Sequence, residues 1–94
     1  MGTLVVAYDL NKERKGWQSD RTSMLAHIKK TWNWAMLSES CYAIEASETP
    51  TAVYKTLRAF IDVNDDIYVV TASRPWNGFG AKVVIEWLRS KLGN

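Results

Sequence analysis

The strongest constraint on the fold is a short apolar run at residues 3–10, which is rich in β-branched residues and contains Asp9. A run of this length and composition is typical of a strand buried on both faces, which predicts a central strand of a sheet. Asp9 comes where this strand would leave the core. A carboxylate there must be paired, bind a cation or lie at a rim of the sheet. We therefore expect the rest of the chain to cover this strand or to line the rim beside Asp9.

Three stretches carry apolar residues at helical spacing. Ser19 or Asp20 can cap the first helix. The second begins at Thr49 and Pro50, a pair suited to an N-cap and a first helical position. Gly93 is placed to close the third. The predicted stripes are Met24, Leu25, Ile28 and Trp32; then Val53, Tyr54, Leu57, Phe60 and Ile61; then Val83, Val84, Trp87, Leu88 and Leu92.

Extended structure is expected at residues 34–46 and 67–72, and the latter is expected to lie beside residues 3–10. The first stretch changes character near residues 38–40, where a bulge or tight hairpin would divide it into two short strands. The order is then β-α-β-β-α-β plus a terminal helix. This predicts a single α+β domain over residues 1–94, ferredoxin-like, with four antiparallel strands and two helices on one face. If residues 34–46 form one continuous strand instead of two, the alternative is a three-layer β-α-β-α-β-α unit.

Composition limits the classes of function. Ninety-four residues fit one domain, and the net charge of +2 with a pI near 8.8 allows a polyanionic partner without requiring one. One histidine, His27, and one cysteine, Cys41, cannot build a zinc site or an internal disulfide. No apolar run approaches the roughly 20 residues of a membrane span, so we expect a cytoplasmic protein that binds no membrane.

Three short motifs match a known group of proteins: residues 5–10 (VVAYDL), 38–45 (SESCYAIE) and 65–70 (DDIYVV). On these motifs the chain resembles the small CRISPR-associated adaptation proteins of the Cas-two family and the related VapD-type toxins and SinR-like proteins. The closing helix at residues 87–89 (WLR) is closer to the SinR-like branch. The resemblance implies a ferredoxin-like homodimer and a nuclease in which Asp9 is the catalytic, metal-binding residue. Two Asp9 side chains facing each other across the dimer axis would suit Mg²⁺ or Mn²⁺, which prefer oxygen ligands.

The chain departs from that group at two places. Residues 11–14 (NKER) follow the aspartate where many relatives carry further acidic residues and arginines, so fewer carboxylates surround Asp9. The C-terminal strand that clasps the partner in the group is replaced here by a predicted helix. Both departures favour a protein that keeps the fold without the nuclease activity.

Basic and aromatic residues gather in two polar loops that follow strands. We expect both loops to share one rim with Asp9, where basic side chains suit a phosphate backbone and tryptophans suit stacked bases. The alternative is a solvated rim with the tryptophans folded over the core, and with Asp9 capping its turn or pairing with Lys12 or Arg14. The predicted nucleic-acid-binding residues are Lys12, Arg14, Lys15, Trp17, Arg21, Arg74 and Trp76.

Two functional hypotheses follow. The first is a small homodimeric protein that interacts with RNA or DNA and cleaves it with Mg²⁺ or Mn²⁺ held by Asp9. The second is a catalytically silent dimer of the same fold that serves as a binding, assembly or regulatory module. A small-ligand domain is a third reading, and it would require a pocket on the open face of the sheet.

Overall fold

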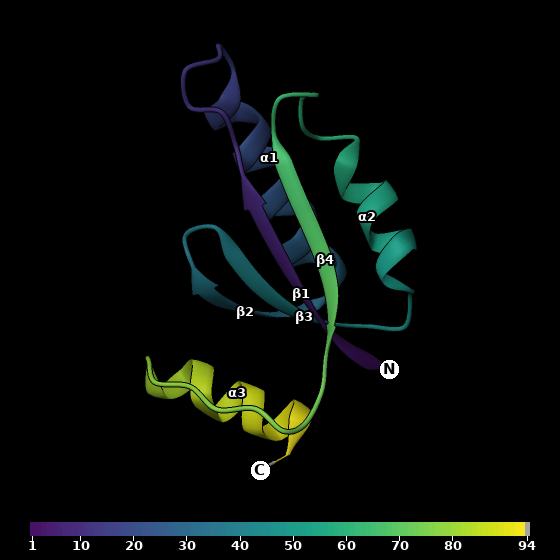
Figure 1. The fold of residues 1–94 in the computed structure, drawn as a ribbon, viewed down its shortest axis with the longest axis vertical. Coiled ribbons are helices and arrows are strands. Elements are labelled where there is room, and N and C mark those ends of the chain that lie inside the picture. Colours follow the sequence, from purple (N-terminus) through teal and green to yellow (C-terminus); the bar gives the residue numbers. More distant parts are fainter. Residues whose placement is uncertain (94) are drawn as a thin grey trace.

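The computed structural model describes residues 1–93, and its elements surround one antiparallel sheet (Figure 1). The strands lie side by side in the order β2-β3-β1-β4, so β1 is central, as the apolar run predicts. This is the ferredoxin-like arrangement expected from the sequence. The elements are β1 (Gly2–Asp9), α1 (Trp17–Thr31), β2 (Asn33–Ser38), β3 (Cys41–Ala46), α2 (Pro50–Arg58), β4 (Asp66–Ala72) and α3 (Lys82–Leu92).

The middle of the chain forms two strands, which settles the choice left open by the sequence. β2 and β3 pair antiparallel, and Glu39 and Ser40 connect them. The register shifts between Met36 and Ser38, so the hairpin contains the expected irregularity as well as the tight connection. The three-layer alternative is therefore wrong for this chain.

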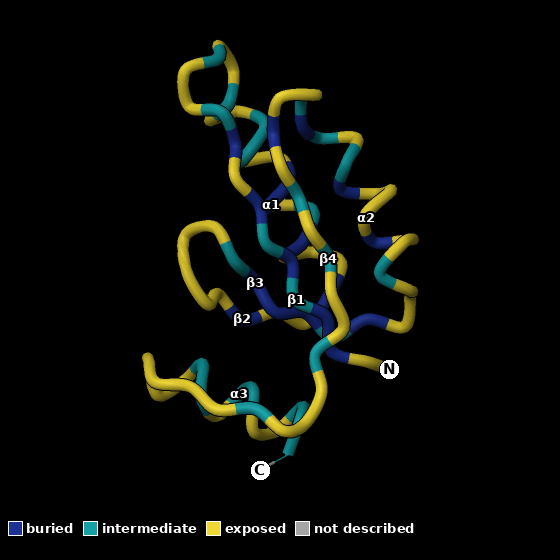
Figure 2. Tube along the Cα trace, in the orientation of Figure 1, coloured by how far each residue is buried: buried dark blue, intermediate teal, exposed yellow. Residues whose placement is uncertain are grey.

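Helices α1 and α2 pack on the face of the sheet that carries Leu4, Val6 and Tyr8 of β1. All three side chains are buried, and Tyr42 and Ile44 of β3 join them. Figure 2 shows this interior as the dark tube along the central strands and the inner sides of the two helices. The first predicted stripe lies wholly within the core, which also contains Val53, Leu57 and Ile61 from the second.

The beginnings of the two packed helices differ in how well the sequence predicted them. Thr49 caps α2 as expected, because its Oγ1 accepts a hydrogen bond from the Ala52 amide at 3.1 Å. The expected cap of α1 by Ser19 or Asp20 is wrong. The helix begins at Trp17, and its N-cap is Gly16, whose φ of 88° favours a residue without a Cβ.

Helix α3 lies on the opposite face of the sheet, at the end where β2 begins (Figure 1). The Trp87 Nε1 donates to Asn33 Oδ1 at 2.9 Å, and the Lys91 ammonium lies 3.3 Å from a Glu45 carboxylate oxygen. Gly93 is the C-cap of this helix, as predicted. Every residue of α3 stays at least partly exposed, so its apolar stripe contributes little to the core (Figure 2).

Among residues 1–93, no helix is both long enough and apolar enough to cross a membrane.

Candidate nucleic-acid interface

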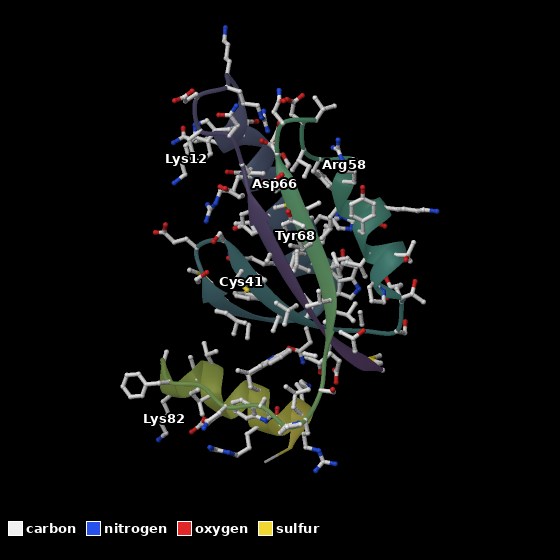
Figure 3. The ribbon with its side chains drawn as sticks, in the orientation of Figure 1. Lys12, Cys41, Arg58, Asp66, Tyr68 and Lys82 are labelled. Carbon is white, nitrogen blue, oxygen red and sulfur yellow. The ribbon has the colours of Figure 1, made fainter. Side chains whose placement is uncertain are left out.

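Two aspartates stand side by side where β1 ends and β4 begins. Asp9 and Asp66 are direct partners in the antiparallel pairing of these strands, and both are exposed. Directly opposed residues point to the same face, with Cβ atoms about 5 Å apart. Asp66 is labelled in Figure 3 at this end of β4. The extended stretch expected from the sequence begins at residue 67, so Asp66 is not among the predicted site residues. Its position directly before an apolar strand was the available signal.

This carboxylate pair can serve as part of a cation site. Like charges directly opposite each other on a sheet are unfavourable unless something neutralises them. Carboxylate oxygens suit Mg²⁺ or Mn²⁺, and Mg²⁺ is commonly held by one or two carboxylates together with water and substrate phosphate. Within the described residues 1–93, no group of three or more His, Cys, Asp or Glu side chains is placed to hold a metal ion.

A cavity of about 550 Å³ opens beside Asp9, and we call it the Asp9 cavity. It lies between the end of β1, the first two turns of α1 and the β2–β3 hairpin. The hairpin reaches this end of the sheet because the Tyr8 amide donates to the Ser40 carbonyl at 2.9 Å. The lining residues are Tyr8, Asp9, Leu10, Lys12, Trp17, Gln18, Arg21, Thr22, Glu39 and Ser40.

Three of the predicted nucleic-acid-binding residues meet Asp9 in this cavity. The Lys12 ammonium lies 5.7 Å from the centroid of the Trp17 ring, a cation–π distance. Arg21 donates one guanidinium N–H to the Glu39 carbonyl at 3.1 Å, which holds the side chain against the hairpin. A cation, an indole ring and a guanidinium thus line one concave surface next to a carboxylate.

Arg14 pairs with two carboxylates of its own chain. Its guanidinium contacts both oxygens of Asp65, with the Nη2–Oδ2 distance 2.6 Å, and its Nη1 lies 2.9 Å from Asp20 Oδ2. These carboxylates raise the pKa of Arg14 and neutralise its charge within the protein. Phosphate binding by Arg14 stays a prediction, and Lys15, exposed on the same loop, lies outside the lining of the Asp9 cavity.

Asp65 is the anchor of this end of the molecule. Its side chain is fully buried and accepts amide hydrogen bonds from Asn11 and Asp62, each at 2.8 Å, besides those from Arg14. The Arg14 hydrogen bonds are the main cause that lowers the pKa of Asp65 to about 2, and the two amide bonds act in the same direction. The carboxylate therefore ties the loop after β1 to the turn before β4 and fixes one wall of the site.

Arg74 and Trp76 lie at the opposite end of the sheet, so the expectation of one shared rim is wrong. β1 and β4 are antiparallel, and the loop that follows β4 therefore leaves the sheet at the end where β1 begins. There the Trp76 Nε1 donates to the Gly93 carbonyl at 2.7 Å, next to the end of α3. Figure 3 shows this separation of the two ends, with Lys12 at one and Lys82 of α3 at the other.

Three further titratable side chains lie in or near this part of the molecule: Tyr8, Cys41 and His27. Burial raises the pKa of the Tyr8 phenol, which donates to the Glu39 carbonyl and secures the hairpin to β1. Burial also raises the pKa of the Cys41 thiol, so this cysteine is a weak nucleophile. His27 lies on α1 and packs against Trp32 and Phe60, outside the Asp9 cavity.

Comparison with known proteins supports the fold. No protein-family model matches the chain, and no curated protein matches it. Among solved structures, it is similar to Cas2 of Streptococcus pyogenes, with a TM-score of 0.63 and 17% sequence identity. The match covers 83% of this chain and 99% of the Cas2 chain. At this level of identity the likeness establishes a shared ferredoxin-like fold.

Proposed function

We propose that this chain is a homodimeric nucleic-acid-binding protein that cleaves phosphodiester bonds with a divalent metal held by Asp9 and Asp66. One observation carries the proposal: Asp9 lies in the same cavity as Lys12, Trp17 and Arg21, directly opposite a second carboxylate. The fold shared with S. pyogenes Cas2 supports it further.

Each group in the site has a distinct role in this proposal. Lys12 and Arg21 bind phosphate oxygens, and Trp17 stacks on a base. Asp9 and Asp66 hold Mg²⁺ or Mn²⁺ with their carboxylate oxygens. When bound, the metal would polarise the phosphate and lower the pKa of an attacking water. Asp65, buried beneath the loop, keeps Asn11 and Arg14 in place and so positions the residues on either side of them.

The proposed dimer uses the part of the open sheet face that α3 leaves uncovered. Tyr68 and Val70 of β4 are 64% and 54% exposed, and they share this face with Asp9 and Asp66. Exposed apolar side chains that gather on one face are typical of an interaction surface. Pairing two such faces would bring the acidic pairs of both copies together, so we expect Mg²⁺ or Mn²⁺ to strengthen the dimer by neutralising them.

A catalytically silent nucleic-acid-binding dimer is the second candidate. It is favoured by the small number of carboxylates, because the described residues 1–93 contain no group of three or more His, Cys, Asp or Glu side chains placed to hold a metal ion. A small-ligand role has a structural basis as well, in an apolar cavity of about 360 Å³ between β2 and α3. Trp34, Met36 and Trp87 are among its lining residues.

The deciding experiment is cleavage of labelled single-stranded RNA and double-stranded DNA by purified protein with Mg²⁺, Mn²⁺ or a chelator. A nuclease should cut only with metal and should lose at least about a hundredfold in rate in Asp9→Asn, a loss typical of removing a key transition-state interaction. Glu13→Gln, which neutralises an exposed carboxylate on the same loop, should retain full activity.

The other outcomes separate the candidates. Binding without cutting, with affinity that falls steeply as salt rises, would support the silent module. Cutting that survives Asp9→Asn would remove Asp9 as the catalytic residue. An absence of both binding and cutting would reject nucleic acid as the partner and direct attention to the cavity beneath α3.

A further inference from the structure

We infer that the Asp9 cavity holds a single unstacked nucleotide, so that the protein selects single-stranded nucleic acid over duplex. This inference rests on the proposed function and specifies its substrate. It concerns the interior of the cavity, formed by the first two turns of α1 and the β2–β3 hairpin, and not the exposed acidic pair.

The size of the cavity suits one nucleotide. Sites for small molecules and cofactors usually have volumes of about 300–1,000 Å³, and the Asp9 cavity falls in this range at about 550 Å³. A duplex presents its phosphates outward and keeps its bases stacked in the interior. A base can therefore enter a cavity only when it has left the stack, which costs least in a single strand.

The aromatic and basic groups are arranged for a base with its attached phosphate. Trp17 is half-buried, and its indole lines the cavity at the first residue of α1. The Lys12 ammonium already lies over that ring, 5.7 Å from its centroid, so a base that stacks on the same face would displace it. The displaced ammonium would then be within reach of the phosphate attached to that base. Stacking on an aromatic side chain is insensitive to sequence, because every base has a π face.

The charges of the lining argue against a simple anion site. Lys12 and Arg21 contribute two positive charges, and Asp9 and Glu39 contribute two negative charges. The two cations would attract a free phosphate about as strongly as the two carboxylates would repel it, so inorganic phosphate alone should bind weakly. A nucleotide adds stacking on Trp17, and the polar groups of Gln18, Thr22 and Ser40 are available to the edge of its base.

The test compares a labelled 12-residue thymidine strand with a hairpin duplex of equal length by fluorescence anisotropy. The wild-type protein should bind the single strand at least about tenfold more tightly. Trp17→Ala should weaken single-strand binding about tenfold, the lower range expected for loss of one stacked base, and should leave hairpin binding unchanged. Trp34→Ala, which removes a partly exposed tryptophan from β2, should behave as wild type.

A second arm keeps the inference separate from the proposed function. Thymidine 5′-monophosphate and inorganic phosphate are titrated into ¹⁵N-labelled protein, and amide shifts are followed at Gln18 and Arg21. Shifts with the nucleotide and not with phosphate support the cavity as a nucleotide site. If no polymer binds, that outcome would reject the proposed function and the selection of single strands, and would keep the cavity as a site for a free nucleotide. Should Trp17→Ala fail to fold, Lys12→Gln takes its place, with a smaller loss of single-strand affinity expected.

Two results would overturn the inference. Equal affinity for strand and hairpin, or equal loss of both in Trp17→Ala, would leave a backbone-binding surface and an unused cavity. Absence of nucleotide shifts together with absence of polymer binding would reject the inference and the proposed function together.

Discussion

Helices α1 and α2 press apolar side chains such as Ile28 and Leu57 into one face of the sheet, where both are fully buried. Helix α3 lies on the other face and keeps each of its residues at least partly exposed, with Val83 at 72%. All three helices have apolar residues at helical spacing. Apolar residues at helical spacing therefore make a helix amphipathic. How much the helix contributes to stability depends on how much of its apolar stripe is buried against the sheet.

The largest expected effect is on the packed face. Leu57→Ala removes a fully buried side chain of α2 and should lower the free energy of unfolding by about 2–5 kcal/mol. Leu88→Ala in α3 removes the same group from a half-buried position and should cost about 1 kcal/mol or less. Urea denaturation of both variants measures the difference, and equal losses would contradict the contrast between the faces.

The contrast between buried and exposed positions holds for polar contacts as well, and Asp65 is the buried example. Asp65→Asn should cost about 1–3 kcal/mol, since a charged acceptor of several hydrogen bonds is lost. The folded pKa of about 2 lies below the ordinary value, so the carboxylate stabilises the fold above pH 4 and loses this effect as the pH falls toward 2.

The pH dependence of unfolding provides the measurement for Asp65. Thermal melts between pH 5 and pH 2 should show a smaller loss of Tm in Asp65→Asn than in wild type. Glu13→Gln is the control, because it removes an exposed carboxylate on the loop that contains Arg14. It should lose little stability at neutral pH, and its loss of Tm between pH 5 and pH 2 should match that of wild type.

A smaller effect is expected where α3 meets the sheet. Trp87→Phe keeps an aromatic ring and removes the N–H that bonds Asn33, at a cost of about 1 kcal/mol or less. Amide hydrogen exchange should quicken in α3 and stay unchanged in α1, because α3 can open without disturbing the core. Uniformly faster exchange in both helices would indicate that they unfold as one unit.

The smallest effect should come from the ion pair of α3. Lys91→Met removes the cation 3.3 Å from Glu45 and should change the free energy of unfolding by 0 to about 1 kcal/mol, less at high salt. Urea titrations at low and high salt would measure it. A loss above about 2 kcal/mol would show that α3 is held as firmly as α1 and α2.

Local patterns in the sequence predicted the parts of the fold that local chemistry determines. The central strand, the Thr49 cap and the division of residues 34–46 into two strands are all confirmed. The prediction that the loops after β1 and β4 share one rim was wrong, because it depended on the relative direction of the two strands. In the ferredoxin-like order, β1 and β4 are antiparallel neighbours, so loops that follow them must lie at opposite ends.

Asp65 and Asp66 illustrate what the sequence could not reveal about the site. They are identical and adjacent, yet one is buried among donors from distant segments and the other is exposed opposite Asp9. Period-two alternation in a strand says that neighbours point to opposite faces, but not which of two aspartates points inward. Asp65 is the buried aspartate because the Arg14 guanidinium and the Asn11 amide, more than 50 residues earlier in the chain, donate hydrogen bonds to its carboxylate.

The exposure of α3 also has a consequence for the order of events in folding. Interactions absent from the core are expected to form after the transition state, which gives φ-values near zero. Substitutions in α3 should then accelerate unfolding while the folding rate stays constant. Substitutions at Ile28 or Leu57 should slow folding itself if these residues belong to the nucleus. The last helix of the chain would thus have little influence on how quickly the native state is reached, which the first two helices would determine.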